Sequence, residues 1–254
     1  IDAGTFLVSA VFVSLIRTPS RGGGSSGSSM LAEARAGIRY AASQRWLWGT
    51  LLMSTLGMFF FFGPMQVLLP YLIRNELDAG SQGYGLVLAA DGVGAVLVSF
   101  LLGQRGVPRR YLTAMYAAFA IGCAPLIGYA LGTSVWQLML FAAVSGAAIT
   151  GGLVIFTTLQ QAFVPSEMLG RVQSLEWFSS AALVPVSFAV TSPVSALLGA
   201  HTTLIVAGAI AATVPVLMYV VLRLGREQGR PLPRDHDEPP PAVPTDLLDE
   251  LDDP

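Results

Sequence analysis

The hydrophobic positions of this chain gather in long blocks that are separated by short polar connections. Six blocks follow an opening apolar stretch and a polar segment, and each is close to the roughly 20 residues that a helix needs to cross a bilayer. They run over residues 46–73, 85–103, 112–131, 135–158, 173–198 and 203–222. Spanning backbone must satisfy its own hydrogen bonds, and the alternation of a membrane β-barrel is absent. The pattern therefore predicts an all-α multi-pass membrane protein with a bundle of six transmembrane helices in residues 46–222.

Three segments lie outside these blocks. Residues 1–16 are apolar but slightly short for a span, and we interpret them as the end of a preceding helix in a sequence that is a fragment. Residues 17–45 are predicted to form a linker with one helix, which either lies on the membrane surface or is solvated. The apolar face of that helix comprises Leu31, Ala34, Ile38 and Ala41. Residues 223–254 are rich in proline and acidic residues, which is typical of a disordered tail.

The arginines give an independent test of this arrangement. If the six helices alternate in direction, Arg74 lies on one side of the membrane and every other arginine lies on the opposite side. The excess of positive charge marks the cytoplasmic side. We therefore expect residues 17–45, 104–111 and 159–171 and the carboxy-terminal tail to be cytoplasmic, in a protein of the cell membrane.

Composition narrows the class further. Hydrophobic residues make up 53% of the chain and charged residues only 12%, about half the charged fraction of soluble domains. The chain has one cysteine, two histidines and no lysine, which excludes an internal disulfide framework and a phosphate-binding loop with its lysine. No catalytic constellation is visible. We therefore expect no enzyme activity, no metal, no cofactor and no nucleic-acid partner.

Asp91 stands out because it lies inside the second apolar block, where an ionised carboxylate is costly. Its depth is about 9 Å in a helix that starts near Gly85. The small residues Gly94 and Ala95, three and four positions on, favour a close-packed or cavity-facing side rather than lipid. Asp91 is therefore a candidate for proton coupling or solute contact. The alternative is a carboxylate that is solvated or hydrogen-bonded and has no role in transport.

Two further polar side chains are candidates for solute or proton contact. Gln66 lies in the first block, where Gly63, Pro64 and Pro70 are expected to bend or break the helix. It either contacts solute at that break or makes an interhelical hydrogen bond. Glu176 lies near the predicted start of the fifth block, and we favour an interaction with the helix dipole over proton coupling.

Four stretches resemble the carboxy-terminal half of the major facilitator superfamily, in the right order and spacing. The stretch GQRGVPRR at 103–110 is similar to the Gly-x-x-x-Asp-Arg-x-Gly-Arg-Arg loop, with Gln104 at the acidic position. The stretch VPSEMLGRVQSLEW at 164–177 resembles the loop between the tenth and eleventh helices of the drug and siderophore exporters, with its Pro-x-x-x-x-Gly-Arg-Val pattern. The stretches DAGTFLVSAVFVSLIR and AGIRYAASQRWLWGTLL resemble the sixth helix and the entry to the seventh.

The resemblance implies helices seven to twelve of a twelve-helix secondary transporter that works by alternating access. It also implies a structural or gating role for a set of cytoplasmic residues. These are Gly103, Arg105, Arg109, Gly170 and Arg171. Gln104 removes the acidic partner of the first loop, which weakens the gating role of Arg105 and Arg109.

The function that follows is secondary active, proton-coupled efflux of a small amphipathic solute such as a drug, macrolide or siderophore. The implied partners are membrane lipid, the solute, the proton and an amino-terminal six-helix half. Phe59 to Phe62 either line an apolar solute pocket or pack between helices, and packing is the simpler interpretation. The alternative function is a truncated six-helix membrane protein, which acts as a scaffold without transport or needs a partner half.

Overall fold

The computed structural model describes residues 6, 9, 12 and 30–226 of the chain. The predicted helix end at 1–16 therefore lies outside the described residues at all but three positions, and so does the tail from residue 227 onward. All regular secondary structure in the described part is helical.

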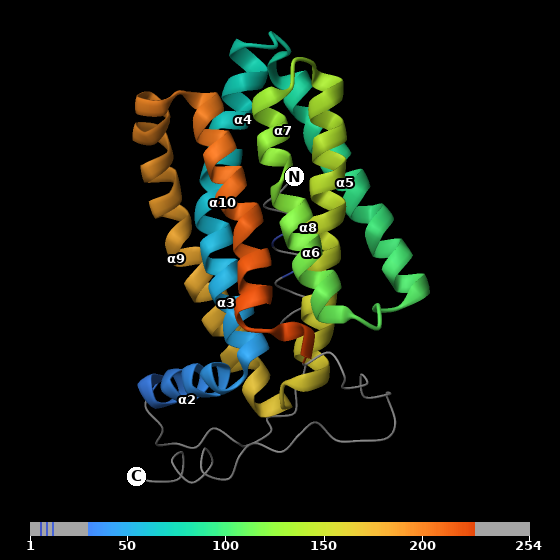
Figure 1. The fold of residues 1–254 in the computed structure, drawn as a ribbon, viewed down its shortest axis with the longest axis vertical. Coiled ribbons are helices and arrows are strands. Elements are labelled where there is room, and N and C mark those ends of the chain that lie inside the picture. The colour runs from blue at the N-terminus through green and yellow to red at the C-terminus, as the bar shows by residue number, and fades with distance from the viewer. Residues whose placement is uncertain (1–5, 7–8, 10–11, 13–29, 227–254) are drawn as a thin grey trace.

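The helices from α3 to α10 follow one another up and down the long axis of the molecule, and α2 lies across that axis at one end (Figure 1). They are α2 (Met30–Ser43), α3 (Arg45–Gly57), the π-helical turn η1 (Met58–Phe62), α4 (Gly63–Asn75), α5 (Gly80–Arg105), α6 (Tyr111–Cys123), α7 (Pro125–Leu131), α8 (Val135–Phe163), α9 (Ser166–Leu198), α10 (Ala200–Val221) and the 3₁₀ turn η2 (Leu224–Arg226).

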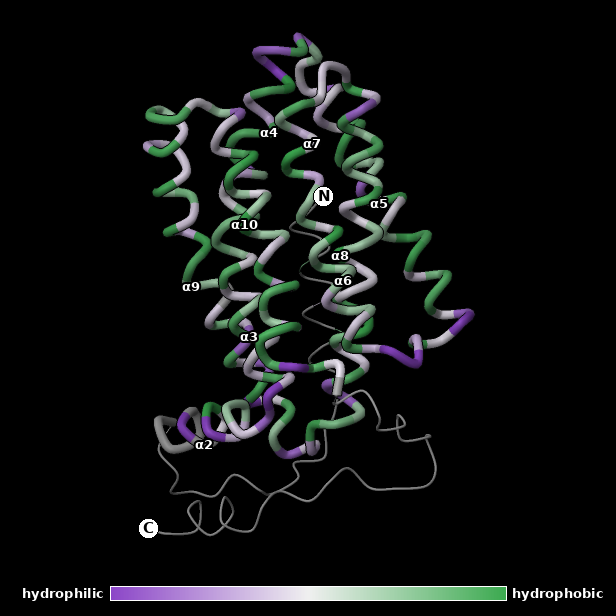
Figure 2. Tube along the Cα trace, in the orientation of Figure 1, coloured by the Kyte–Doolittle hydropathy of each residue, from purple (hydrophilic) through white to green (hydrophobic). Residues whose placement is uncertain are grey.

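Six helical units within the described residues are long and apolar enough to cross a membrane. They are Arg45–Asn75, Gly80–Arg105, Tyr111–Leu131, Val135–Phe163, Ser166–Leu198 and Ala200–Val221. Figure 2 shows hydrophobic residues along their length and polar residues gathered mainly at the two ends. The predicted all-α fold with six membrane-spanning helices is confirmed.

Two of the spans, α5 and α9, lie on opposite sides of the bundle (Figure 1). The helix α8 packs against α5 and α6, and α10 packs against α6 and α7, while α9 lies against η1 and α4. In the view of Figure 1, α5 and α9 form the two outer edges. In the most apolar 18-residue stretch of α5, and likewise of α9, only 11% of the residues are buried. The corresponding share is 50% for the span made of α6 and α7. These two helices therefore present most of their surface to the outside of the bundle.

Small residues bring α5 and α8 into close contact. A Cβ atom on Gly94 of α5 would clash with the Ala143 carbonyl oxygen of α8, and one on Gly146 of α8 would clash with the Asp91 carbonyl oxygen of α5. Such small residues let two backbones approach closely in a membrane, where dispersion contacts replace the hydrophobic driving force. This contact places the backbone of Asp91 directly against Gly146 of α8.

The first span changes its hydrogen-bond pattern at η1 and does not break. Pro64 has no N–H, and its ring crowds the carbonyl four residues earlier, which favours a wider π turn just before it. The hydroxyl of Ser187 on α9 donates to the Phe59 carbonyl and accepts from the Gly63 N–H, with a nitrogen–oxygen distance of 3.0 Å. A side chain of the neighbouring helix thus satisfies backbone groups in this turn.

Two predicted boundaries were wrong, the end of α8, which lies at Phe163, and the start of α9. This helix starts at Ser166, so the connection expected at 159–171 is reduced to Val164 and Pro165. Pro165 supplies an extended residue before the helix, with φ −54° and ψ 142°, and the polar residues that follow have side chains compatible with a helix. The helix α9 is therefore longer than the apolar block at 173–198.

The helix α2 occupies the second part of the predicted linker and packs against α3 and α9. Its buried face contains Gly37, Tyr40 and Ala41, whereas Ile38 is 53% exposed. Of the expected apolar face, Ala41 is thus buried against neighbouring helices and Ile38 points away from the bundle. Burial also raises the pKa of the Tyr40 hydroxyl.

Candidate functional site

Asp91 lies in the middle of α5 and is only partly exposed. Its backbone touches α8 at Gly146, and a Cβ atom there would come 2.9 Å from the carboxylate carbon of Asp91. The carboxylate therefore lies beside the α5–α8 contact, as the neighbouring Gly94 and Ala95 indicated. This position stays within the membrane-spanning part of the helix.

Tyr129 of α7 is the polar group that sequence reasoning missed. Its side chain is 1% exposed, and its ring meets Phe141 edge to face at 6.4 Å between centroids. The hydroxyl lies near the polar groups of Asp91 and Ser145 but makes no hydrogen bond of normal geometry among the described residues. The Ser145 hydroxyl donates to the Gly122 carbonyl at 2.9 Å, which leaves its oxygen able to accept from Tyr129. Asp91 and Tyr129 thus bring an acceptor and an unused donor to the same region.

Among the described residues, other acidic or basic side chains are absent from α8 and lie only towards the ends of α4 and α5. Residues 135–163, which form α8, contain no acidic or basic side chain. On α4, Arg74 lies in the last turn and is exposed. On α5 itself, Arg105 lies in the last turn, 14 positions after Asp91 in the printed sequence. Asp91 therefore has Tyr129 as its ionisable neighbour within the described bundle.

Glu176 lies about three turns inside α9, not in its first turn. The terminal-turn role favoured for it was wrong, because α9 begins at Ser166 and Glu167 is the acid of the first turn. Gln160 of α8, which is buried, donates from Nε2 to Glu176 Oε2 at 3.0 Å. Glu176 therefore forms part of a polar tie between α8 and α9.

Gln66 lies on an exposed position of α4, next to the buried Gly63 and Pro64. Within the described residues it makes no side-chain hydrogen bond, so the interhelical bond considered for it is not formed in this conformation. No hydrogen bond or ion pair of the described part joins Gln66, Asp91 and Glu176. The three candidates belong to three different helices and form no common cluster.

A small apolar cavity lies between the first span, α9 and α10. Its volume is about 110 Å³, and its lining includes Phe59, Phe60, Pro64, Ser187 and Ile210. The aromatic run thus contributes two of its four rings to this cavity. Pockets for drug-sized ligands measure roughly 300–1,000 Å³, so this cavity alone is too small for such a solute.

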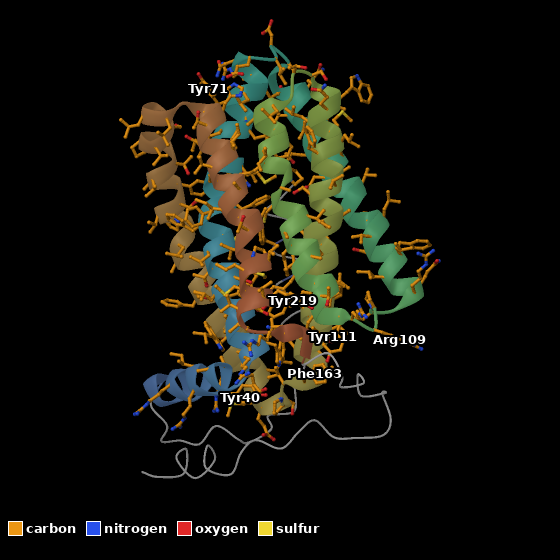
Figure 3. All side chains as sticks on the ribbon, in the orientation of Figure 1. Tyr40, Tyr71, Arg109, Tyr111, Phe163 and Tyr219 are labelled. Carbon is orange, nitrogen blue, oxygen red and sulfur yellow. The ribbon has the colours of Figure 1, made fainter. Side chains whose placement is uncertain are left out.

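The predicted loop residues lie at one end of the bundle, on separate elements. Gly103 and Arg105 are exposed in the last turns of α5, and Arg109 is exposed in the connection to α6. Gly170 and Arg171 lie in the second turn of α9, where α2 packs Gly37 against Arg171. In Figure 3, the labelled Arg109 and Tyr40 lie at this end and Tyr71 lies at the other.

The described residues contain no group of three histidine, cysteine or acidic side chains that could hold a metal ion. The arrangement offers a titratable carboxylate beside a hydroxyl, at Asp91 with Tyr129, and a polar tie between two helices, at Glu176 with Gln160.

Comparison with known families agrees with the architecture. A family model described as transmembrane secretion effector, within the major facilitator superfamily, matches residues 8–249. Comparison with curated proteins and with solved structures finds no match. The matched range includes all six candidate spans and both loops that carried the resemblance. This chain therefore belongs to the transmembrane secretion effector family of the major facilitator superfamily.

Proposed function

We propose that this protein exports a small amphipathic organic solute in exchange for protons, with Asp91 as the group that binds and releases the proton. Family membership implies membrane transport, and the solute and the coupling are the proposal. The observation that supports it most is the position of Asp91. Its carboxylate lies within a span, beside a close helix contact and a buried hydroxyl without a partner.

The proposed cycle follows from the cost of a charge in a membrane. Protonation neutralises Asp91 and permits its burial, whereas the ionised carboxylate requires water or a donor. The Tyr129 hydroxyl is a donor that remains unused in the described conformation. A change between outward and inward exposure then moves one proton against the solute.

The solute class is proposed from the character of the spans. The apolar cavity beside η1 is lined by aromatic and branched side chains, together with hydroxyls such as that of Ser187. The arginines of the described bundle lie at helix ends, so the spans offer no cationic clamp for a phosphorylated solute. Because this cavity is too small for a drug-sized molecule, we place the full solute site at the boundary with a second half.

The partner half is proposed from the exposed faces of α5 and α9. Both carry large apolar side chains that the described bundle leaves uncovered. They include Val93, Val96, Leu97 and Phe100 on α5 and Trp177, Phe178, Val190 and Leu197 on α9. We propose that an amino-terminal six-helix half covers part of these faces. The end that bears α2 and most arginines is then cytoplasmic, in the cell membrane.

The same faces also favour a second candidate, a membrane scaffold that assembles with a partner and transports nothing. The two candidates differ in one measurable property, the movement of solute under a pH gradient. Exposed apolar faces are required by both, so they do not decide between them.

The test uses proteoliposomes that contain the protein together with its amino-terminal half, loaded with an amphipathic fluorescent dye. We expect an imposed pH gradient to accelerate dye movement and a protonophore to abolish the acceleration. Movement that is unchanged by the protonophore would refute proton coupling. If no dye in a panel moves faster than in empty liposomes, the scaffold candidate replaces the transporter.

A further inference from the structure

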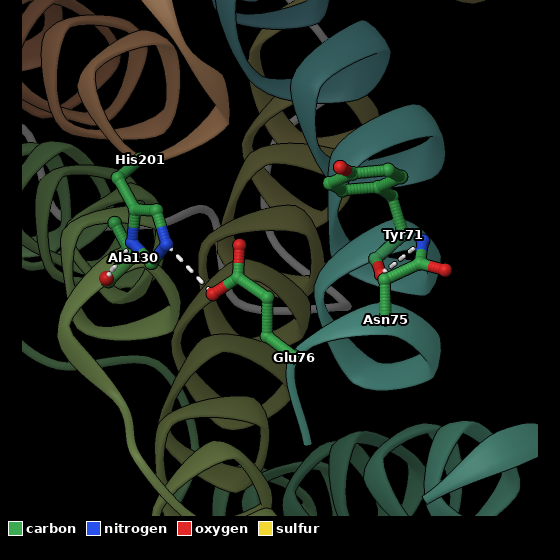
Figure 4. Close-up of polar contacts among 5 residues, drawn as sticks. All are labelled: Tyr71, Asn75, Glu76, Ala130 and His201. Carbon is green, nitrogen blue, oxygen red and sulfur yellow. Dashed lines mark hydrogen bonds and ion pairs between the residues drawn. The ribbon is translucent and has the colours of Figure 1, made fainter. Parts of the chain in front are cut away.

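His201 is held between two hydrogen-bond acceptors (Figure 4). It lies at the start of α10, at the end of the bundle opposite to α2 (Figure 1). Its Nδ1 lies within hydrogen-bond distance of the Ala130 carbonyl oxygen, and its Nε2 lies 2.7 Å from Glu76 Oε2. Glu76 caps the end of α4, Ala130 lies in the last turn of α7, and His201 lies in the first turn of α10. One imidazole therefore connects the ends of three candidate spans.

The geometry fixes the number of protons in this contact. A carbonyl oxygen only accepts, so Nδ1 must carry a hydrogen and donate it to Ala130. Nε2 and the carboxylate oxygen then need one more hydrogen between them, either on the ring or on Glu76. A neutral imidazole facing an ionised carboxylate would instead place two lone pairs 2.7 Å apart. The contact therefore contains one proton more than a neutral ring and an ionised acid.

Few other charged groups face this position. Arg74 lies in the last turn of α4, Asp78 follows in the connection to α5, and neither makes an ion pair within the described residues. On α7 the ionisable group is Tyr129, which is buried beside Phe141, and α10 carries its tyrosine, Tyr219, near its opposite end. The end of α9 next to Gly199 carries no ionisable side chain within Val190–Leu198. Glu76 is thus the group that shares the proton with His201.

We infer that His201 and Glu76 form a second proton-binding site, separate from Asp91, which clamps the ends of α4, α7 and α10. The ligand of this site is a proton. The side chains of His201 and Glu76 are 49% and 41% exposed, so protons can reach them from the solution at this end. Proton binding closes the contact, and proton loss releases α10 from α4.

This inference extends the proposed function without depending on Asp91 or on a particular solute. Alternating access requires one end of the bundle to open while the other is closed. A clamp that closes on protonation gives the solution at this end control over that step. The site is therefore a pH-dependent gate, and its state can be measured without a transport assay.

The experiment measures the separation of α4 and α7 by electron paramagnetic resonance in lipid nanodiscs. Because α7 stays joined to α10 through the His201–Ala130 hydrogen bond, this separation reports the release of α10 from α4. Spin labels are attached at Tyr71→Cys and Leu131→Cys, which replace exposed residues outside the clamp, while the native Cys123 is buried. The pH is varied from about 5 to about 9, across the range in which an imidazole ordinarily titrates. We expect a narrow distance distribution at acidic pH and a broader, longer one at alkaline pH.

Two substitutions in the clamp and one control substitution make the result decisive. In Glu76→Gln the amide can accept from a protonated ring or donate to a neutral one, so the distribution should stay narrow at both pH extremes. In His201→Phe it should stay broad at both. His236→Gln removes the other histidine of the chain and should behave as the parent protein. Circular dichroism and elution as a single species establish that each variant is folded.

A parent distribution that is the same at every pH would overturn the inference. So would a Glu76→Gln variant that titrates as the parent does, because the proton would then reside elsewhere. Either result leaves proton coupling at Asp91 untouched, and failure of Asp91 in transport leaves the clamp untouched.

Discussion

Tyr129 shows how a single residue departs from the rule that buried polar groups find partners. An unpaired buried hydroxyl costs about 1–3 kcal/mol, so its retention in an apolar cluster requires an explanation. The cluster around it contains Leu69, Ile73, Val87 and Leu138. The explanation that we favour is intermittent donation to Asp91 during the transport cycle.

Replacement of Tyr129 by phenylalanine tests this role. The ring can keep its edge-to-face contact with Phe141, while the unpaired hydroxyl is removed. We expect a free energy of unfolding that is unchanged or higher by up to about 1 kcal/mol, together with an altered pH profile of efflux. Thermal unfolding in detergent and efflux at several pH values measure the two effects. A lower stability with an unchanged pH profile would show a purely structural role.

In contrast to Tyr129, Ser187 has a hydroxyl that both donates and accepts a hydrogen bond. It bonds the Phe59 carbonyl and the Gly63 N–H of the π turn. Ser187→Ala should lower stability by about 1 kcal/mol, as interhelical hydrogen bonds in membranes typically contribute. Ser195→Ala on the same helix is the control, since that exposed hydroxyl bonds only the Ser192 carbonyl. Equal melting temperatures for both variants would contradict this role.

The sequence located single residues such as Asp91 along the helices, but it did not predict which side chains they contact. Asp91 was recognisable as an acid within an apolar block, and small residues indicated its packed side. Its neighbour Tyr129 lies 38 positions away in the printed sequence and resembles any aromatic residue of a span. The partner of His201, Glu76, is separated from it by 125 positions, and no local pattern predicts such a pair.

At the scale of elements, the pair α5 and α8 depends on close approach of two backbones. Gly94→Ala would place a methyl group against the Ala143 carbonyl, whereas Gly92 has open space on the same helix. We expect Gly94→Ala to cost about 1–3 kcal/mol and Gly92→Ala to cause no loss. Thermal unfolding of both variants checks the difference. Equal stability would mean that α5 and α8 do not pack as described.

The helices themselves were largely predictable because length and apolarity determine a span. The main exception is the start of α9, where polar residues were taken for a loop although Ser166 begins a helix. Hydropathy locates the membrane-embedded part of a helix and not its extension into water. The π turn is a second exception, since Pro64 indicated an irregularity but not that Ser187 would satisfy the backbone there.

At the scale of the whole molecule, the arginines and α2 define one end of the bundle and the clamp of His201 defines the other. We expect the arginine end to be cytoplasmic. Single substitutions Arg109→Cys and Thr133→Cys place thiols at opposite ends, and the native Cys123 is buried. A membrane-impermeant thiol reagent should label Thr133→Cys on intact cells and Arg109→Cys only after permeabilisation. The reverse labelling would invert the topology.

The central claim is that Asp91 carries the transported proton, and separation of coupling from solute exchange tests it most directly. In proteoliposomes with the complete transporter, Asp91→Asn should abolish pH-gradient-driven efflux and retain exchange of solute down its own gradient, because asparagine is neutral at every pH. Glu176→Gln is the matched control and should retain gradient-driven efflux. Gradient-driven efflux by Asp91→Asn at the parent rate would remove Asp91 from the coupling mechanism.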